Sequence, residues 1–395
     1  MNSVRLFMPG NFLDSYIYAG HLFAIFSDGT IRALDISELL ASIISVRKAD
    51  TILHKIAFQR NDWIENPQGR SFLAIRRVSG NFLAEWRRIC KEDLIASPSE
   101  EKWKFIGKLP ELKINDFRVY GMKVMVGARS GVFEVGIEAR ENKHILRASG
   151  DLRKVSDIPA IALNAKGGQM VVSAGNEGLL HGPIGYPNNR TPLSADEHVT
   201  TSLRTGWQGY DLVNYISQQD FSYFENETKK QEERPHLYSR TDEPSEKILI
   251  ATFGRRIVSS AELIPQEYSN KDDLMLSFNS NNGFFQIRRD GRIQWFMTKR
   301  IRDGRLEIDP RERALGKIDR RGSAFRPMSA HFGRDKTVLE FFDKVRVLES
   351  GHLWTLEGGP AVSLRTFPSS RRFRNLVLIT SEKGIIIHSL SPRTP

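Results

Sequence analysis

Nine histidines and one cysteine are the residues of this sequence best suited to metal binding or nucleophilic chemistry. The histidines are His21, His54, His144, His181, His198, His236, His331, His352 and His388. No two of them stand at the spacing of zinc ligands, and the single cysteine, Cys90, can form neither an internal disulfide nor a cysteine-rich metal knuckle. The sequence therefore predicts no metal site, no cofactor and a reducing compartment. Basic neighbours would lower the pKa of an exposed Cys90 thiol, but burial as a packing residue is the favoured interpretation.

Local catalytic motifs are also missing from the sequence. It has no glycine loop ending in Lys-Ser or Lys-Thr, no dinucleotide fingerprint and no Gly-x-Ser-x-Gly elbow. The glycines Gly175, Gly178, Gly182 and Gly185 are expected in turns between strands. We therefore do not expect an enzyme. A site assembled from residues far apart in the sequence remains an alternative, and no residue is nominated for it.

Arginine is concentrated between Arg288 and Arg326, where thirteen basic residues outnumber six acidic ones. The planar guanidinium group binds phosphate or carboxylate bidentately, and the net charge of +11 also favours an acidic partner. The alternative is a solvated surface whose arginines pair with nearby carboxylates. The candidate residues for binding nucleic acid or another anion are Arg288, Arg289, Arg292, Arg300, Arg302, Arg305, Arg320, Arg321, Arg371, Arg372 and Arg374.

The sequence becomes polar from residue 185 to residue 246, with eleven acidic and five basic residues between Asp196 and Glu246. This composition predicts an inserted loop. Its first half has too many aromatic residues for a solvated linker, so it is either a docking arm for a partner protein or a hydrophobic flap. The candidate partner-binding residues are Trp207, Tyr210, Tyr215, Phe221, Tyr223 and Phe224.

The elements that must position these residues are short β-type runs joined by tight turns. The clearest example is residues 21–26 and 30–34 around Ser27-Asp28-Gly29, because Asp-Gly between two such runs is a strong hairpin signal. Comparable units centre on Ser79-Gly80, Ser130-Gly131, Glu177-Gly178, Phe253-Gly254, Asp290-Gly291, Asp343-Lys344 and Lys383-Gly384. Their spacing of roughly 50 residues is typical of four-stranded propeller blades.

The sequence therefore predicts an all-β fold, a single β-propeller domain over residues 1–395 with seven to eight blades. A pair of β-sandwiches or a β-solenoid would share the same local signals. Residues 4–8 are expected to pair with the C-terminal strands at 376–380 and 385–390, which would close the propeller and remove exposed sheet edges.

One segment also resembles a known repeat family. Residues 27–35, Ser-Asp-Gly-Thr-Ile-Arg-Ala-Leu-Asp, are similar to the inner hairpin of WD40 repeats, with Ala33-Leu34-Asp35 in place of the usual Leu-Trp-Asp ending. No Trp-Asp dipeptide occurs in the chain, and the other units share only the rhythm of strand and turn. The resemblance implies a WD40-like β-propeller in the broad sense.

The composition of the chain also predicts where the protein is located and what kind of function it has. The chain has no apolar run long enough to span a bilayer and no signal peptide, which predicts a protein that is not secreted and does not insert into membranes. The expected location is the cytoplasm, or the nucleus in a eukaryote. We expect a non-enzymatic scaffold that binds other protein subunits. The alternatives are a nucleic-acid-binding subunit and an enzyme with its site at the propeller channel.

Overall fold

The computed structural model describes residues 3–43, 51–63, 66–139, 146–209, 211–230, 249–264, 271–280, 283–300, 306–309, 313–318, 327–332, 336–370 and 372–391. The chain divides into two compact units. The first comprises residues 1–112, 327–349 and 354–395, and the second comprises residues 113–326 and 350–353. Among the described residues, no helix has the length and apolar character needed to span a membrane.

Three sheets belong wholly or mainly to the first unit, and antiparallel pairing predominates in them. The first sheet runs β2 (Phe12–Tyr18), β3 (His21–Phe26), β4 (Thr30–Asp35), β6 (Lys104–Lys108). The second runs β29 (Ser363–Thr366), β30 (Leu376–Ser381), β31 (Gly384–Leu390), β1 (Ser3–Pro9), β5 (Asp93–Ile95). The third runs β25 (Ser329–Phe332), β26 (Thr337–Phe341), β27 (Lys344–Glu349), β28 (His352–Gly358). The first strands contact one another, because β29 touches both β2 and β25.

Four sheets form the second unit on the same plan. The first contains β7 (Ile114–Tyr120), β8 (Lys123–Ala128), β9 (Gly131–Ala139), β10 (Leu146–Ala148) and β11 (Arg153–Ser156). The second contains β12 (Ala162–Lys166), β13 (Gln169–Ser173), β14 (Leu179–Pro183) and β15 (Ser194–Ala195), and the third contains β16 (Arg204–Gln208), β17 (Asp211–Tyr215), β18 (Phe221–Lys230) and β19 (Leu249–Ser259). The fourth contains β20 (Leu274–Ser280), β21 (Gly283–Arg288), β22 (Arg292–Arg300), β23 (Leu306–Ile308) and β24 (Arg313–Lys317). Here too the first strands touch, β12 contacting β7 and β16, and β16 contacting β20.

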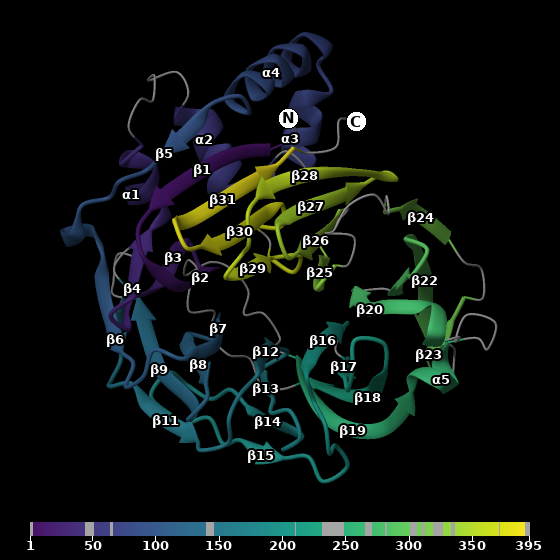
Figure 1. The fold of residues 1–395 in the computed structure, drawn as a ribbon. Coiled ribbons are helices and arrows are strands. Elements are labelled where there is room, and N and C mark those ends of the chain that lie inside the picture. The colour runs from purple at the N-terminus through teal and green to yellow at the C-terminus, as the bar shows by residue number, and fades with distance from the viewer. Residues whose placement is uncertain are drawn as a thin grey trace. The chain divides into compact units, whose positions relative to one another are not determined.

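The described residues thus form seven sheets, built mainly from strands that follow one another in the chain, and these sheets are the blades of a β-propeller (Figure 1). The predicted all-β propeller is confirmed, and the blade number is seven. The predicted terminal pairing is confirmed as well, because β1 runs antiparallel to β31 from Ser3 opposite Leu390 to Pro9 opposite Gly384.

The sequence predicted a strand-turn-strand unit around Ser79-Gly80, and this prediction is wrong. Residues between β4 and β6 form the helices α1 (Ile36–Ala41), α2 (Thr51–Phe58), α3 (Pro67–Leu73) and α4 (Arg76–Ile89). Helix α4 forms because Val78, Phe82, Trp86 and Ile89 share one face, which packs on the core of the first unit. Phe253-Gly254, expected at a turn, lies inside the long strand β19.

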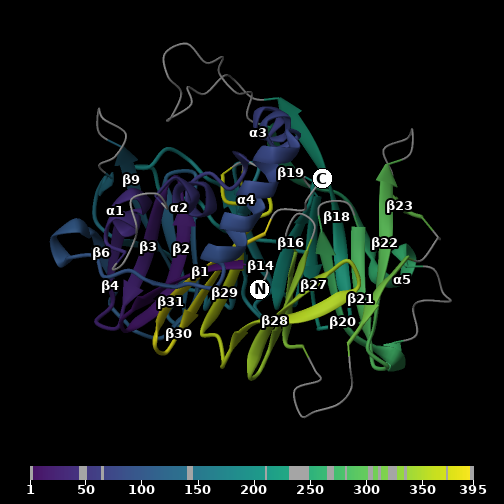
Figure 2. The same ribbon diagram turned by 90° about the horizontal axis from the view of Figure 1, so that it is seen from above.

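Hydrogen bonds join the helices α2 and α4 to the end of the chain at β31, whose sheet also contains β1. Ser389 Oγ donates to the carbonyl of Ala57 in α2 at 2.8 Å, and Trp86 Nε1 in α4 donates to Ser391 Oγ at 2.9 Å. Figures 1 and 2 show α2, α3 and α4 grouped beside β1 and β31. Two short helical segments, α5 (Ser260–Leu263) and the 3₁₀ turn Lys271–Asp273, precede β20.

Candidate functional site

The aromatic residues predicted to bind a partner lie inside a blade. Trp207 is 8 % exposed on β16, and Tyr215, Phe221, Tyr223 and Phe224 on β17 and β18 are each 1 % exposed or less. The Phe221 ring stacks on Phe284 of β21 with centroids 4.7 Å apart. Tyr210 lies outside the described residues.

This arrangement differs from the expected inserted loop. Residues 204–230 form three consecutive strands of a regular blade, and their alternating aromatic side chains fill its faces. Polar composition suggested a loop, but several of the polar residues in these strands, Gln208, Asp211, Asn214 and Glu225, are themselves buried in the blade. The structure therefore places these aromatic rings in packing positions and does not present them to a partner.

The candidate anion-binding arginines are spread over both units. Arg288 is buried, with its Nε donating to Gln294, while Arg289 is exposed and Arg292 pairs with Asp290. Arg372 is exposed and Arg374 half-buried in the first unit. Arg302, Arg305, Arg320, Arg321 and Arg371 lie outside the described residues, as does the side chain of Arg300. The described arginines thus comprise buried, paired and exposed members, with no common environment.

Metal binding and nucleophilic chemistry depend on the surroundings of the histidines and of Cys90. Within the described ranges, no three His, Cys, Asp or Glu side chains are grouped to hold a metal ion. Cys90 is 4 % exposed, and burial raises the pKa of its thiol, so its interpretation as a packing residue is confirmed.

A hydrogen-bonded chain of serine, histidine and glutamate was not expected from the sequence. Ser3 Oγ lies 3.3 Å from His388 Nδ1, and His388 Nε2 lies 3.0 Å from Glu357 Oε2. Ser3 and His388 are both almost fully buried, at 8 % and 2 % exposed. The three residues come from β1, β31 and β28, so the chain of hydrogen bonds ties the terminal strands to the neighbouring blade.

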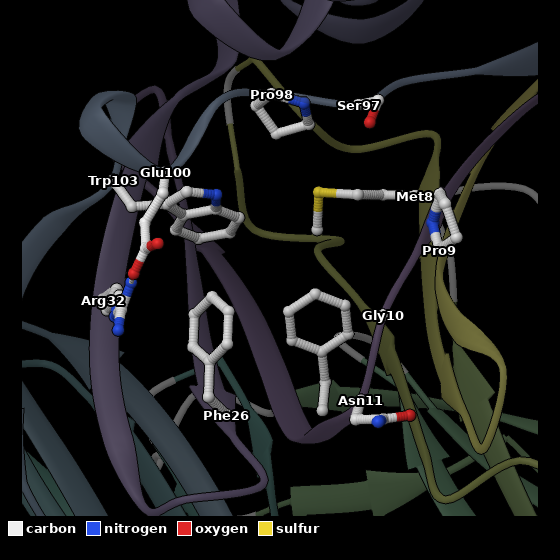
Figure 3. Close-up of a pocket in the computed structure, with 11 residues that line it drawn as sticks. Met8, Pro9, Gly10, Asn11, Phe26, Arg32, Ser97, Pro98, Glu100 and Trp103 are labelled. Carbon is white, nitrogen blue, oxygen red and sulfur yellow. Dashed lines mark hydrogen bonds and ion pairs between the residues drawn. The ribbon is translucent and has the colours of Figure 1, made fainter.

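A pocket of about 290 Å³ opens in the first unit where β1 leads into β2 (Figure 3). One wall is the end of β1 and the turn after it, and the other is the segment between β5 and β6. The lining residues are Met8, Pro9, Gly10, Asn11, Phe12, Phe26, Arg32, Ser97, Pro98, Glu100 and Trp103. All of them belong to the described residues of the first unit.

The turn after β1 is shaped by Gly10. Its φ is +153°, and a Cβ there would lie 2.6 Å from Cε2 of Phe12, so only glycine lets the Phe12 ring fold beneath the turn. On the opposite wall, the Ala96 amide donates to the Phe7 carbonyl at 2.9 Å and the Ser97 amide to the Ser42 carbonyl at 3.3 Å. Backbone hydrogen bonds thus hold both walls.

The floor of the pocket is a cluster of three aromatic rings. Phe26 meets Phe12 edge-to-face with centroids 5.0 Å apart, and meets Trp103 in the same way at 5.1 Å. Such pairs keep ring edges and faces available for a ligand, since each ring uses only part of its surface on its neighbour. In Figure 3, Trp103 and Phe26 lie across the pocket from Met8 and Pro9.

The polar side chains at the pocket are the Arg32–Glu100 ion pair, the indole of Trp103, the amide of Asn11 and the hydroxyl of Ser97. The Arg32 guanidinium lies 4.8 Å from the Phe26 centroid, and its Nη1 donates to Glu100 Oε1 at 2.8 Å. Arg32 and Glu100 are the titratable residues of the lining, so the pair leaves it without net charge. The indole nitrogen of Trp103 faces the pocket interior in Figure 3 and has no hydrogen-bond acceptor among the described residues.

Comparisons with known proteins add little to this description. No family model and no curated protein matches the chain. The fold is similar to the β-propeller domain of Cps50 (Swd1) from Myceliophteria thermophila, at 11 % identity and a TM-score of 0.48 over 99 % of each chain. It is also similar to the WD40 β-propeller domain of Doa1, at 7 % identity and a TM-score of 0.42 over 98 % of this chain and 92 % of that one.

A third similar structure is a putative 6-phosphogluconolactonase from Bacteroides uniformis, at 12 % identity and a TM-score of 0.41 over 70 % of this chain and 80 % of that one. At such low identity and TM-score, none of these likenesses bears on what this chain binds. The class of protein follows from its own sheets: a seven-bladed β-propeller.

Proposed function

We propose that this chain is a non-enzymatic, WD40-like scaffold that holds another protein by a peptide segment bound in the pocket of Phe12, Phe26 and Trp103. The observation that carries the proposal is the aromatic floor of this pocket, which is open to solvent and bounded by backbone-anchored walls. Aromatic side chains in such pockets supply most of the binding energy at protein interfaces.

The ion pair at the rim favours binding of a protein over the other functions considered. Phosphate binding needs unpaired positive charge, whereas the Arg32 guanidinium is paired with Glu100. General acid–base chemistry needs a titratable group that is free to exchange a proton with the ligand. The two titratable groups of the lining, Arg32 and Glu100, are instead paired with each other. The lining offers mainly apolar contact, together with uncharged polar groups.

Affinity purification from native lysate tests the proposal. The bait would be the wild type and the variants Trp103→Ala, which removes part of the floor, and Ser97→Trp, which fills the pocket without truncating the core. Phe342→Ala is the matched control, because Phe342 is an aromatic residue of the same unit that is 76 % exposed at the β26–β27 turn.

We expect wild type and Phe342→Ala to retain the same partner after nuclease treatment and at high salt, and both pocket variants to lose it. Unchanged melting temperatures would separate loss of binding from loss of folding. Retention of the partner by both folded pocket variants would contradict the proposal. Recovery of nucleic acid alone, released by salt, would instead favour the anion-binding alternative.

A further inference from the structure

We infer that the pocket selects a proline-rich segment in the polyproline II conformation. This inference rests on the proposed function, since it names the kind of peptide that the same pocket takes. Three features of the pocket support it: the charge of the lining, the N–H donor of Trp103 and the arrangement of the aromatic rings.

The lining selects an uncharged, apolar ligand. Its acid and its base neutralise each other at 2.8 Å, and the Arg32 guanidinium is further occupied by the face of Phe26. Met8, Pro9, Pro98 and the three rings supply most of the remaining surface, and the uncharged side chains of Asn11 and Ser97 complete it. A charged side chain entering here would lose water without gaining a partner, which costs several kcal/mol in general terms.

The indole of Trp103 selects an exposed backbone carbonyl. Its Nε1 hydrogen faces the pocket and has no acceptor among the described residues, so a ligand that fills the pocket must supply one. Peptide carbonyls in a helix or a paired strand are already hydrogen-bonded within their own element. In a polyproline II segment they point outward and have no internal partner.

The rings select side chains with the shape of proline. Phe26 stands edge-to-face between Phe12 and Trp103, whose own centroids are 6.4 Å apart, so the floor is grooved by ring edges. A helix is about 10 Å across and meets such a floor only with single side chains. A polyproline II segment has three residues per turn and lays flat pyrrolidine rings along it at a small entropic cost.

Fluorescence anisotropy with a labelled ten-residue oligoproline tests this selectivity on the full chain. A Gly-Ser peptide of the same length and label is the matched control peptide, because it is flexible and has no proline rings. The decisive variant is Trp103→Phe, which keeps an aromatic ring and removes the N–H donor together with part of the ring surface. Phe342→Ala serves as the control variant outside the pocket.

We expect saturable binding of oligoproline by the wild type and Phe342→Ala, and none of the Gly-Ser peptide. Trp103→Phe should weaken binding by at least about threefold to tenfold, the value of the lost hydrogen bond, and Ser97→Trp should abolish it. High salt should leave the affinity unchanged because the lining has no net charge.

Absence of saturable oligoproline binding would overturn the inference, as would equal binding by Ser97→Trp. If Trp103→Phe does not fold, the comparison of Ser97→Trp with wild type decides the question. The proposed function and the proposed choice of peptide can each be contradicted without the other. Loss of a protein partner in the pocket variants without oligoproline binding leaves the scaffold function standing, whereas oligoproline binding with an unaffected partner removes the pocket from that function.

Discussion

His388 Nε2 on β31 lies 3.0 Å from Glu357 Oε2 on β28, and Arg5 Nε on β1 donates to the same oxygen at 3.0 Å. Burial holds the pKa of His388 below its usual value, so its imidazole is neutral at pH 7 and donates from Nε2. Burial would raise the pKa of Glu357, but the hydrogen bonds from His388 and Arg5 outweigh it and lower that pKa to about 2.

This cluster predicts a loss of stability in acid. The pKa of Glu357 is about 2 in the folded chain against 4.5 as a free group, so its contribution is full above pH 4.5 and is lost as the pH falls toward 2. His388 acts in the same direction from pH 6.5 downward, because the unfolded imidazole takes a proton first.

Urea unfolding between pH 7 and pH 3 measures this effect. Glu357→Gln should lose roughly 3 kcal/mol at pH 7 and show a flatter pH dependence below pH 4.5. Glu382→Gln, at an exposed position of the β30–β31 turn, is the control and should follow the wild type. Parallel curves for Glu357→Gln and wild type would contradict the assignment.

A second prediction concerns a buried ion pair in the second unit. Lys123 Nζ lies 3.1 Å from Glu134 Oε2, with the two side chains 0 % and 1 % exposed. Lys123→Met should cost up to about 3–5 kcal/mol, because the buried Glu134 carboxylate loses its fully buried cationic partner and keeps the half-exposed Arg153 guanidinium, 2.8 Å away. Lys154→Met removes the exposed pair with Asp157 and should cost under about 1 kcal/mol. Equal losses in denaturant unfolding would show that burial does not set the cost.

Substitutions at two glycines distinguish the cost of backbone strain from the cost of a steric clash. Gly178 and Gly20 have φ of +83° and +85°, but a Cβ at Gly178 would lie 2.1 Å from the Val199 carbonyl oxygen, while a Cβ at Gly20 would meet nothing within 4 Å. Gly20→Ala should cost about 1–2 kcal/mol for the backbone alone. Gly178→Ala should cost at least twice as much, since the backbone of residue 199 must move. Similar melting temperatures for the two variants would be inconsistent with the clash.

The first strand should be required for folding. Leu6 on β1 is 1 % exposed and lies in the core of the first unit, so Leu6→Ala should cost about 2–5 kcal/mol. Deletion of residues 1–10 removes the partner of β31 along its whole length and exposes that edge. We expect a lower melting temperature and aggregation in light scattering. A deletion variant that melts like the wild type would disprove the role of β1.

The aromatic segment should behave as core. Trp207→Ala should cost about 3–5 kcal/mol, because the ring is 8 % exposed between β16 and its neighbours. Phe342→Ala should stay within about 0.5 kcal/mol. Thermal unfolding of the two variants distinguishes the cases. A stable Trp207→Ala protein that had lost a partner would restore the docking-arm interpretation.

The sequence by itself determined the elements whose signals are local. At Ser27-Asp28-Gly29, the Asp28 carboxylate accepts from the Thr30 amide at 2.9 Å and from its hydroxyl at 2.6 Å, so the turn is stabilised by the residues that signal it. Alternating apolar residues and these turns were enough to predict an all-β propeller and the pairing of the terminal strands.

Tertiary packing decided the rest. The apolar residues of α4 stabilise a helix because that face packs on the core of the first unit. The aromatic residues at 207–224 are buried because they pack against side chains of neighbouring strands. The pocket depends on β4 and β6, whose register sets Ala33 opposite Lys104 and so brings Trp103 to Phe12 and Phe26. Contacts between residues this far apart depend on strand register and burial, which no short stretch of sequence encodes.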